Sequence, residues 1–306
     1  MIFRLLPFLC ACVLGQGLFF AQDARADSGP RVYATIPELT WILRELSPQG
    51  ARVESLVEAG VNAHYVDAKP SFVMKLRDAD MVCAVGLGLE GAWLGRSIER
   101  SFNHKLNSTH SCTVGPEISV IGEANSPKDR SHGHLHAEGN PHFWYAPSRM
   151  IEAANYLSKR VQFLYTGEEG EASRSAELTE KSTQLTAKLH TLLSSARAKL
   201  SKNSVRTVSQ YHSDFDYLIE DLGLEKTMSI ESKPGVPPST AQLSKFKKTM
   251  SDKKVKVILS LPWDPKESVF GLAKELGATV VEWPVNKENY LEAFEIFVQR
   301  LDEALQ

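Results

Sequence analysis

The sequence predicts an α/β protein made of two similar lobes, each with a mainly parallel sheet, joined by a long rigid helix. Two stretches, 31–85 and 204–283, alternate runs typical of strands with helical patterns. Such alternation implies parallel strands covered by helices. Between them, residues 168–200 are charged, contain no proline and repeat apolar residues at helical spacing.

The first lobe is expected to contain three strands. β-branched and aromatic residues favour strands at 31–36 and 51–57, and an apolar run favours a buried strand at 81–85. Pro37 opens the helix after the first strand, because proline is well tolerated in the first helical turn. A second helix is expected over 72–77.

The long helix is predicted from about Glu168 to Leu200. Its apolar stripe recurs at spacings of three, four and seven: Leu178, Leu185, Leu189, Leu192, Ala196 and Leu200. At 1.5 Å per residue it would be about 50 Å long, enough to run along two lobes and hold their separation nearly fixed. An ordinary amphipathic surface helix would show the same stripe.

The second lobe repeats the alternating pattern. Its expected strands are 204–209, 255–260 and 278–283, and its expected helices are 215–222, 240–250, 265–276 and 289–305. Ser239 follows two prolines and is a favourable N-cap for the second of these helices. The chain is therefore expected to divide into a first lobe (27–165), a linker helix (166–202) and a second lobe (203–306).

The first 26 residues have the features of a signal peptide. Arg4 gives a positive start, 5–20 is apolar, and Ala24-Arg25-Ala26 supplies the small residues that signal peptidase recognises. The apolar run is short for a membrane span, which needs about 20 residues, although a retained anchor is the alternative. Cleavage after Ala26 would release a soluble protein into the periplasm.

Charge and cysteine content narrow the class of protein. The formal net charge is −2, whereas a nucleic-acid-binding protein would carry a basic excess. After cleavage two cysteines remain, Cys83 and Cys112. In an oxidising compartment an even pair suggests one disulfide bond, and two buried thiols are the alternative. Two cysteines are too few for a zinc site made of thiolates.

Four of the nine histidines fall between residues 132 and 142. Neutral imidazole is a common ligand of divalent metals, and such a cluster indicates metal binding rather than a merely polar loop. His132, His134 and His136 are interpreted as an accessory arm. His142 lies beside a proline and three aromatic residues, which favour a fixed backbone and a direct metal ligand.

His64 and His212 share the context of His142, because each lies near the end of an expected element and beside aromatic residues. The three histidines are 78 and 70 residues apart, unlike the short local pairs of a zinc finger. The fold must bring them together, two from the first lobe and one from the second. Three imidazoles suit zinc better than calcium, magnesium or manganese.

A dinucleotide site must also be considered, because Gly86, Gly88 and Gly91 match G-x-G-x-x-G. Glu90 would place a negative charge in a loop that has to hold pyrophosphate. The acidic residue expected about 20 positions later is missing. These glycines therefore favour a tight strand-to-helix turn.

Taken together, these features resemble the zinc/manganese-type solute-binding proteins of bacterial ABC transporters. The matching segments extend over nearly the whole mature chain: 60–71, 79–90, 140–147, 211–224 and 237–239. The resemblance implies two α/β lobes joined by a rigid helix and one metal ion in the cleft between them. It also implies delivery of the metal to a membrane permease.

One departure from the family concerns the fourth ligand. The family usually has an aspartate just after the last strand, where this sequence has Trp283. Glu282 is adjacent, but side chains alternate along a strand, so it can serve only if the strand has already ended. The candidates for the fourth position are therefore water, Glu282 and Asp264, in that order.

The sequence thus predicts an exported monomer that binds zinc, or less favourably manganese, and passes it to an ABC importer without enzymatic activity. A secreted zinc-dependent hydrolase is the alternative, because three histidines and an open position also make a catalytic site. Against it, the sequence has no His-Glu-x-x-His motif. A protein of the same fold with a chelated metal or an adhesive function is a third interpretation.

Overall fold

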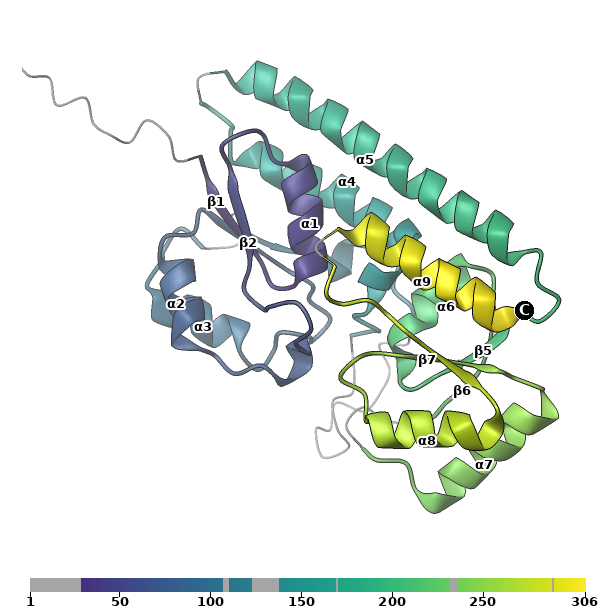
Figure 1. Ribbon diagram of the computed structural model, residues 1–306. Helices are drawn as coiled ribbons and strands as arrows, with labels where there is room; N and C mark the ends of the chain where they lie inside the picture. Colours follow the sequence, from purple (N-terminus) through teal and green to yellow (C-terminus); the bar gives the residue numbers. More distant parts are fainter. Residues whose placement is uncertain (1–28, 107–109, 123–137, 169, 232–235, 288) are drawn as a thin grey trace, which may run out of the picture.

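The structure, a computed structural model, describes residues 29–106, 110–122, 138–168, 170–231, 236–287 and 289–306. These ranges form two sheets, each of four parallel strands, with helices packed around them (Figure 1). The predicted fold class is confirmed. The expected signal peptide (1–26) and the arm of His132, His134 and His136 lie outside the described residues. Within those ranges no helix is long and apolar enough to span a membrane.

The first sheet has the strand order β2-β1-β3-β4. Its strands are β1 (Arg31–Ala34), β2 (Arg52–Ser55), β3 (Met81–Ala84) and β4 (Ser111–Thr113), and its helices are α1 (Pro37–Leu46), α2 (Pro70–Arg77), α3 (Leu94–Ser101) and α4 (Pro147–Phe163). Every residue of β3 is buried, as expected for a parallel strand covered on both faces. Because parallel strands end at the same edge, the loops that follow them meet there.

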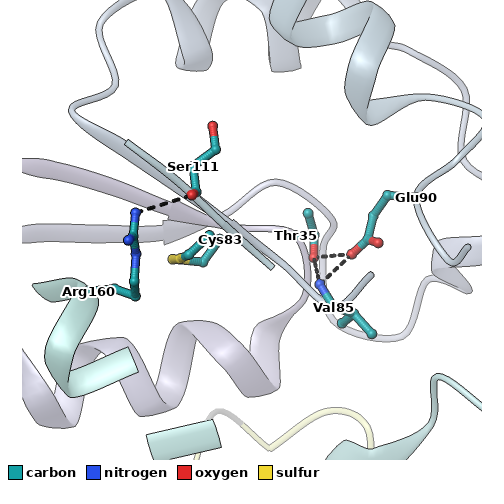
Figure 2. Close-up of a disulfide and its surroundings, with 7 residues drawn as sticks. Thr35, Cys83, Val85, Glu90, Ser111 and Arg160 are labelled. Atoms are coloured by element: carbon teal, nitrogen blue, oxygen red, sulfur yellow. Dashed lines mark hydrogen bonds between the residues drawn. A yellow bond between two sulfur atoms is a disulfide. The ribbon is translucent and has the colours of Figure 1, made fainter. Parts of the chain in front are cut away.

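Cys83 and Cys112 form a disulfide bond, as predicted. The two residues face each other in the register of β3 and β4, with Cα atoms 4.5 Å apart, and both are buried. Figure 2 shows the bond near Arg160 of α4, whose Nη2 donates to the Ser111 carbonyl at 3.3 Å. Since β4 is only three residues long, the bond secures a short edge strand to its neighbour.

Replacing both cysteines by serine is expected to lower the free energy of unfolding by about 3–4 kcal/mol, because the bond closes a loop in the unfolded chain across a separation of 29 residues. Guanidinium unfolding of the oxidised protein and of the Cys83→Ser/Cys112→Ser double variant would measure the loss. Equal unfolding midpoints would contradict the stabilising role of this bond.

The glycine-rich turn after β3 is occupied by the protein's own carboxylate. Gly86 and Gly88 have φ of 80° and 82°, which favours glycine in a tight turn. Glu90 accepts hydrogen bonds from the Thr35 hydroxyl at 2.6 Å and from the Val85 N–H at 2.8 Å (Figure 2). It also accepts from the Gly86 N–H at 3.0 Å. These amides are the donors that a bound phosphate would need, so the turn is structural.

The long helix α5 (Glu171–Leu200) runs past both sheets (Figure 1). Its 30 residues span about 45 Å, and it contacts α1 and α4 of the first lobe and α9 (Tyr290–Leu305) of the second. Its buried residues are Leu178, Leu185, Leu189, Leu193, Ala196 and Leu200. The predicted stripe was wrong at one position: Leu193 is buried because it continues the i, i+4 row from Leu189, whereas Leu192 is partly buried.

The second sheet has the strand order β6-β5-β7-β8. Its strands are β5 (Thr207–Gln210), β6 (Glu225–Ser229), β7 (Val257–Ser260) and β8 (Thr279–Glu282), and its other helices are α6 (Asp216–Asp221), α7 (Thr240–Asp252) and α8 (Lys266–Leu276). Ser239 caps α7 in a capping box with Gln242. The edge strand β6 was not predicted, because its residues are mostly polar and none is fully buried.

Aromatic side chains from both lobes pack into a shared core. Trp283, directly after β8, is 2% exposed, and its ring centre lies 4.9 Å from that of Tyr145 in the first lobe. It also lies 5.3 Å from the ring of Phe297 in α9. Tyr145 in turn contacts the ring of Phe215 in the second lobe at 5.0 Å. The relative position of the lobes is therefore fixed by packing as well as by α5.

Candidate metal centre

Loops that follow strands of both sheets line a cavity of about 230 Å³ between the lobes. Its lining includes three histidines and three carboxylates that could contact a cation: His64, His142, His212, Asp214, Glu231 and Asp264. The ring centres of His64 and His142 lie 5.1 Å apart, and those of His142 and His212 lie 5.8 Å apart. The fold thus brings together the three histidines that the sequence singled out.

His64 is held by the asparagine two residues before it. Asn62 caps the short 3₁₀ helix Ala63–Tyr65. Its Oδ1 accepts hydrogen bonds from the backbone N–H of His64 at 3.0 Å and from the ring Nδ1 at 2.9 Å. In a neutral imidazole, donation from Nδ1 leaves the lone pair on Nε2. The local sequence Asn-x-His therefore orients the ring and sets its tautomer.

The same arrangement recurs at His142. Asn140 Oδ1 accepts from the backbone N–H of His142 at 2.9 Å and from its Nδ1 at 2.8 Å. The imidazole is buried, and it packs edge-on against Trp144 with ring centres 5.2 Å apart. His142 accordingly presents Nε2 from a fixed position in the first lobe.

His212 follows β5, and its Nδ1 lies 3.3 Å from Oε2 of Glu231, which follows β6. Burial acts to lower the pKa of His212, but the contact with Glu231 and the charge of Asp214 outweigh it, so the net shift is upward. The Nδ1 atoms of all three histidines therefore face a side-chain oxygen. Metal-binding histidines are usually oriented by such a contact.

Asp214 adds a carboxylate to the histidine cluster. Its Oδ1 lies 3.1 Å from Nε2 of His142, and possible ligand atoms of His142, His212 and Asp214 all lie within 4.8 Å of one another. Burial raises the pKa of Asp214 to about 7, because little water solvates its charge. A cation bound at this point would compensate the buried negative charge.

Of the two side chains that the sequence offered as a fourth ligand, Asp264 and Glu282, only Asp264 lines the described cavity. Asp264 lines the cavity, but its Oδ2 accepts from the Leu261 N–H at 2.7 Å and from the Ser260 hydroxyl at 2.9 Å. Burial raises its pKa to about 6. Glu282 ends β8 and is not among the described residues that line the cavity, and its Oε1 is buried with no hydrogen-bond partner in the described part of the chain. Trp283 lies in the aromatic core.

Sequence reasoning missed two carboxylates, Asp214 and Glu231. Asp214 is two residues after His212, in the turn that follows a predicted strand, so its place at the sheet edge could have been inferred. Glu231 gave no comparable indication, because it follows β6, the polar edge strand that neither alternation nor an apolar run revealed.

Comparison with known proteins gives the family. Residues 32–304 match the family model described as the zinc-uptake complex component A, periplasmic. The chain belongs to this family. The match covers both sheets, the helix α5 and all the polar cavity residues named above.

The individual proteins and solved structures that are similar to this chain are distant from it in sequence. The zinc-binding lipoprotein AdcA of Streptococcus pneumoniae is 23% identical over 256 residues, 83% of this chain and 49% of that protein. The chain thus spans about half the length of this curated relative. A crystal structure of ZnuA has a TM-score of 0.74 at 20% identity, with 91% and 100% of the two chains covered. The structure of FpvC from Pseudomonas aeruginosa in complex with Mn²⁺ has a TM-score of 0.72 at 21% identity, with 90% and 98% covered. At these identities the structural likeness shows the fold.

Proposed function

We propose that the protein binds one divalent transition metal ion, zinc by preference, through His64, His142, His212 and Asp214. The convergence of three oriented imidazoles with a buried carboxylate 3.1 Å from His142 Nε2 carries this proposal. Three nitrogens and one oxygen form a four-ligand set of the kind that zinc takes in proteins. Glu231 then orients His212 from behind, and Asp264 lies outside the ligand set.

Manganese is the second candidate metal. Imidazoles favour zinc, whereas manganese prefers carboxylate and water oxygens. The same cavity is lined by further carboxylates besides Asp214, among them Glu231 and Asp264, and they would suit manganese if more than one carboxylate coordinated. The family description and the name of the pneumococcal relative support zinc, and the structural neighbour FpvC was solved with Mn²⁺.

The proposed role is to carry the metal outside the cytoplasm and deliver it to the permease of an ABC importer. The signal-peptide features of residues 1–26, with cleavage after Ala26, and the periplasmic family description support export. In this proposal the chain acts as a monomer with a first lobe (27–165), a linker helix (166–202) and a second lobe (203–306).

The fourth ligand favours a metal-binding protein over a zinc-dependent hydrolase. A catalytic zinc keeps one position open for water or substrate, whereas a closed set of four protein ligands binds the ion without activating water. Asp214 next to His142 would close the set. The match to a family of uptake components points the same way.

Metal analysis of the purified protein, followed by titration of the metal-free form, tests the proposed function. We expect the unmutated protein to bind about one zinc ion per chain. Manganese should bind at least about a hundredfold more weakly, because the stability order of divalent metals favours zinc at imidazole-rich sites. Equal affinity for the two metals would favour manganese as an alternative cargo. Absence of tight binding of either metal would refute the proposed function.

A further inference from the structure

We propose that Asn140 is a positioning residue that connects the two halves of the metal site through one side-chain amide. Its Oδ1 accepts the two hydrogen bonds from His142, at 2.9 and 2.8 Å. Its Nδ2 donates to the backbone carbonyl of Ser213 at 2.7 Å. Ser213 lies between His212 and Asp214, so one amide orients a ligand of the first lobe and holds the segment that carries two ligands of the second. This inference rests on the proposed function.

The backbone of Asn140 is bound to the second lobe as well. Tyr217 of α6 extends its hydroxyl across the interface, donates to the Asn140 carbonyl at 2.6 Å and accepts from the Ile121 N–H at 3.0 Å. Asn140 and Tyr217 are both buried, so these bonds are shielded from competing water. The side chain and the main chain of Asn140 thus make separate contacts with the second lobe.

Asn62 offers a matched comparison within the same chain. It makes the same two bonds to His64, at 3.0 and 2.9 Å, two residues upstream of its histidine. The bonds that the structure describes for its amide both stay within the first lobe. Each asparagine therefore orients its own histidine, and the described bonds differ in that Asn140 also donates to Ser213.

The bond from Asn140 sets the spacing of the half-sites before a metal arrives. A site whose ligands are already in place loses less conformational freedom on binding, and this increases affinity. Without the bond, His142 would still be oriented, but the turn with His212 and Asp214 could move away from it. Bound metal would then dissociate faster.

The test compares zinc binding by Asn140→Asp and Asn62→Asp. Each variant keeps an oxygen that can accept from its histidine and gains one negative charge beside it. Only Asn140→Asp also loses the N–H group that donates to the Ser213 carbonyl in the second lobe. It places a carboxylate oxygen beside that carbonyl oxygen, and both atoms are acceptors. We expect Asn140→Asp to weaken zinc binding at least about tenfold, equivalent to about 1.4 kcal/mol, mainly through faster dissociation. Asn62→Asp should weaken it less than about threefold.

Two further measurements separate positioning from a folding defect. Melting of the metal-free variants shows whether each is folded, and the visible absorption spectrum of the cobalt-loaded proteins reports ligand geometry. We expect the spectrum to change in Asn140→Asp and to stay as in the parent in Asn62→Asp. Should Asn140→Asp not fold, the pair Asn140→Ala and Asn62→Ala carries the test. Both variants lose the oxygen that accepts from the histidine, and Asn140→Ala also loses the bond to Ser213, so it should release zinc faster than Asn62→Ala.

Equal affinities and equal cobalt spectra in the two aspartate variants would overturn the role of Asn140. Equal rates of zinc release from Asn140→Ala and Asn62→Ala would overturn it if Asn140→Asp does not fold. A parent protein that binds no zinc would instead refute the proposed function, so the two failures are distinguishable.

Discussion

Replacing His142 by alanine is expected to weaken zinc binding by more than about a hundredfold. Loss of a residue that only orients a metal ligand typically costs about 10–100-fold, and loss of the ligand itself removes a metal bond outright. His64→Ala and His212→Ala should have comparable effects, and Asp214→Asn should approach them because the amide lacks the charge. Competition titration with a chelator of known affinity would measure each loss.

Three control variants sharpen this ranking. His190→Ala removes an exposed histidine of α5, and Glu282→Gln changes a residue outside the described cavity lining, so both should alter affinity less than about threefold. His134→Ala, in the accessory arm, should also cost far less than His142→Ala. A loss in Glu282→Gln as large as that in Asp214→Asn would move the fourth ligand to the end of β8. A loss in His134→Ala equal to that in His142→Ala would contradict the ranking of arm and site.

Zinc affinity is expected to fall steeply in mild acid. Burial raises the pKa of Asp214 to about 7, and the pKa of His212 also lies above its ordinary value. Both groups therefore carry a proton in the metal-free protein at pH 5–6, and zinc must displace it. Each displaced proton costs about tenfold in affinity per pH unit, so we expect a loss of about a hundredfold between pH 6 and 5. A loss smaller than tenfold would contradict this proton count.

Stability should change with pH in opposite directions in the metal-free and zinc-loaded proteins. The folded pKa of Asp214 is raised above its ordinary 3.8, so the folded state binds more protons than the unfolded state between pH 4 and 7. Its contribution to stability is present in acid and is lost as the pH rises towards 7. Bound zinc compensates the buried charge of Asp214 and so removes this loss of stability. The affinity for zinc also increases over the same pH range. The difference between the two melting temperatures should therefore grow from pH 5 to 7.5, and Asp214→Asn should flatten the decline of the metal-free protein. A constant difference would contradict the account.

Much of the fold could be predicted because its buried elements have strong local patterns. The apolar run of β3 and the Ser239 cap of α7 lie where the sequence indicated, and so does the stripe of α5 except at Leu192. The edge strands β4 and β6 could not be predicted, since one has three residues and the other is largely polar. Their places depend on pairing with a neighbouring strand, which no local pattern encodes.

The candidate site was predictable in part for the same reason. His64 and His212 come after predicted strands, and the ends of parallel strands converge, so these two could be expected at the sheet edges. His142 was indicated by the histidine cluster and by the proline and aromatic residues beside it. The carboxylates depend on three-dimensional detail. Glu231 follows the unpredicted strand β6, and the direction of the Asp214 side chain is set by a turn of three residues. The Trp283 ring packs against Tyr145 in the core, a contact between residues far apart in the sequence.

The most direct test of the central claim is a crystal structure of the zinc-loaded protein. We expect one zinc ion in the cavity, bound by Nε2 of His64, His142 and His212 and by a carboxylate oxygen of Asp214, each at about 2.0–2.2 Å. Zinc bound by Glu282, or by water in place of Asp214, would contradict the proposed ligand set. Zinc bound outside this cavity would contradict the site altogether.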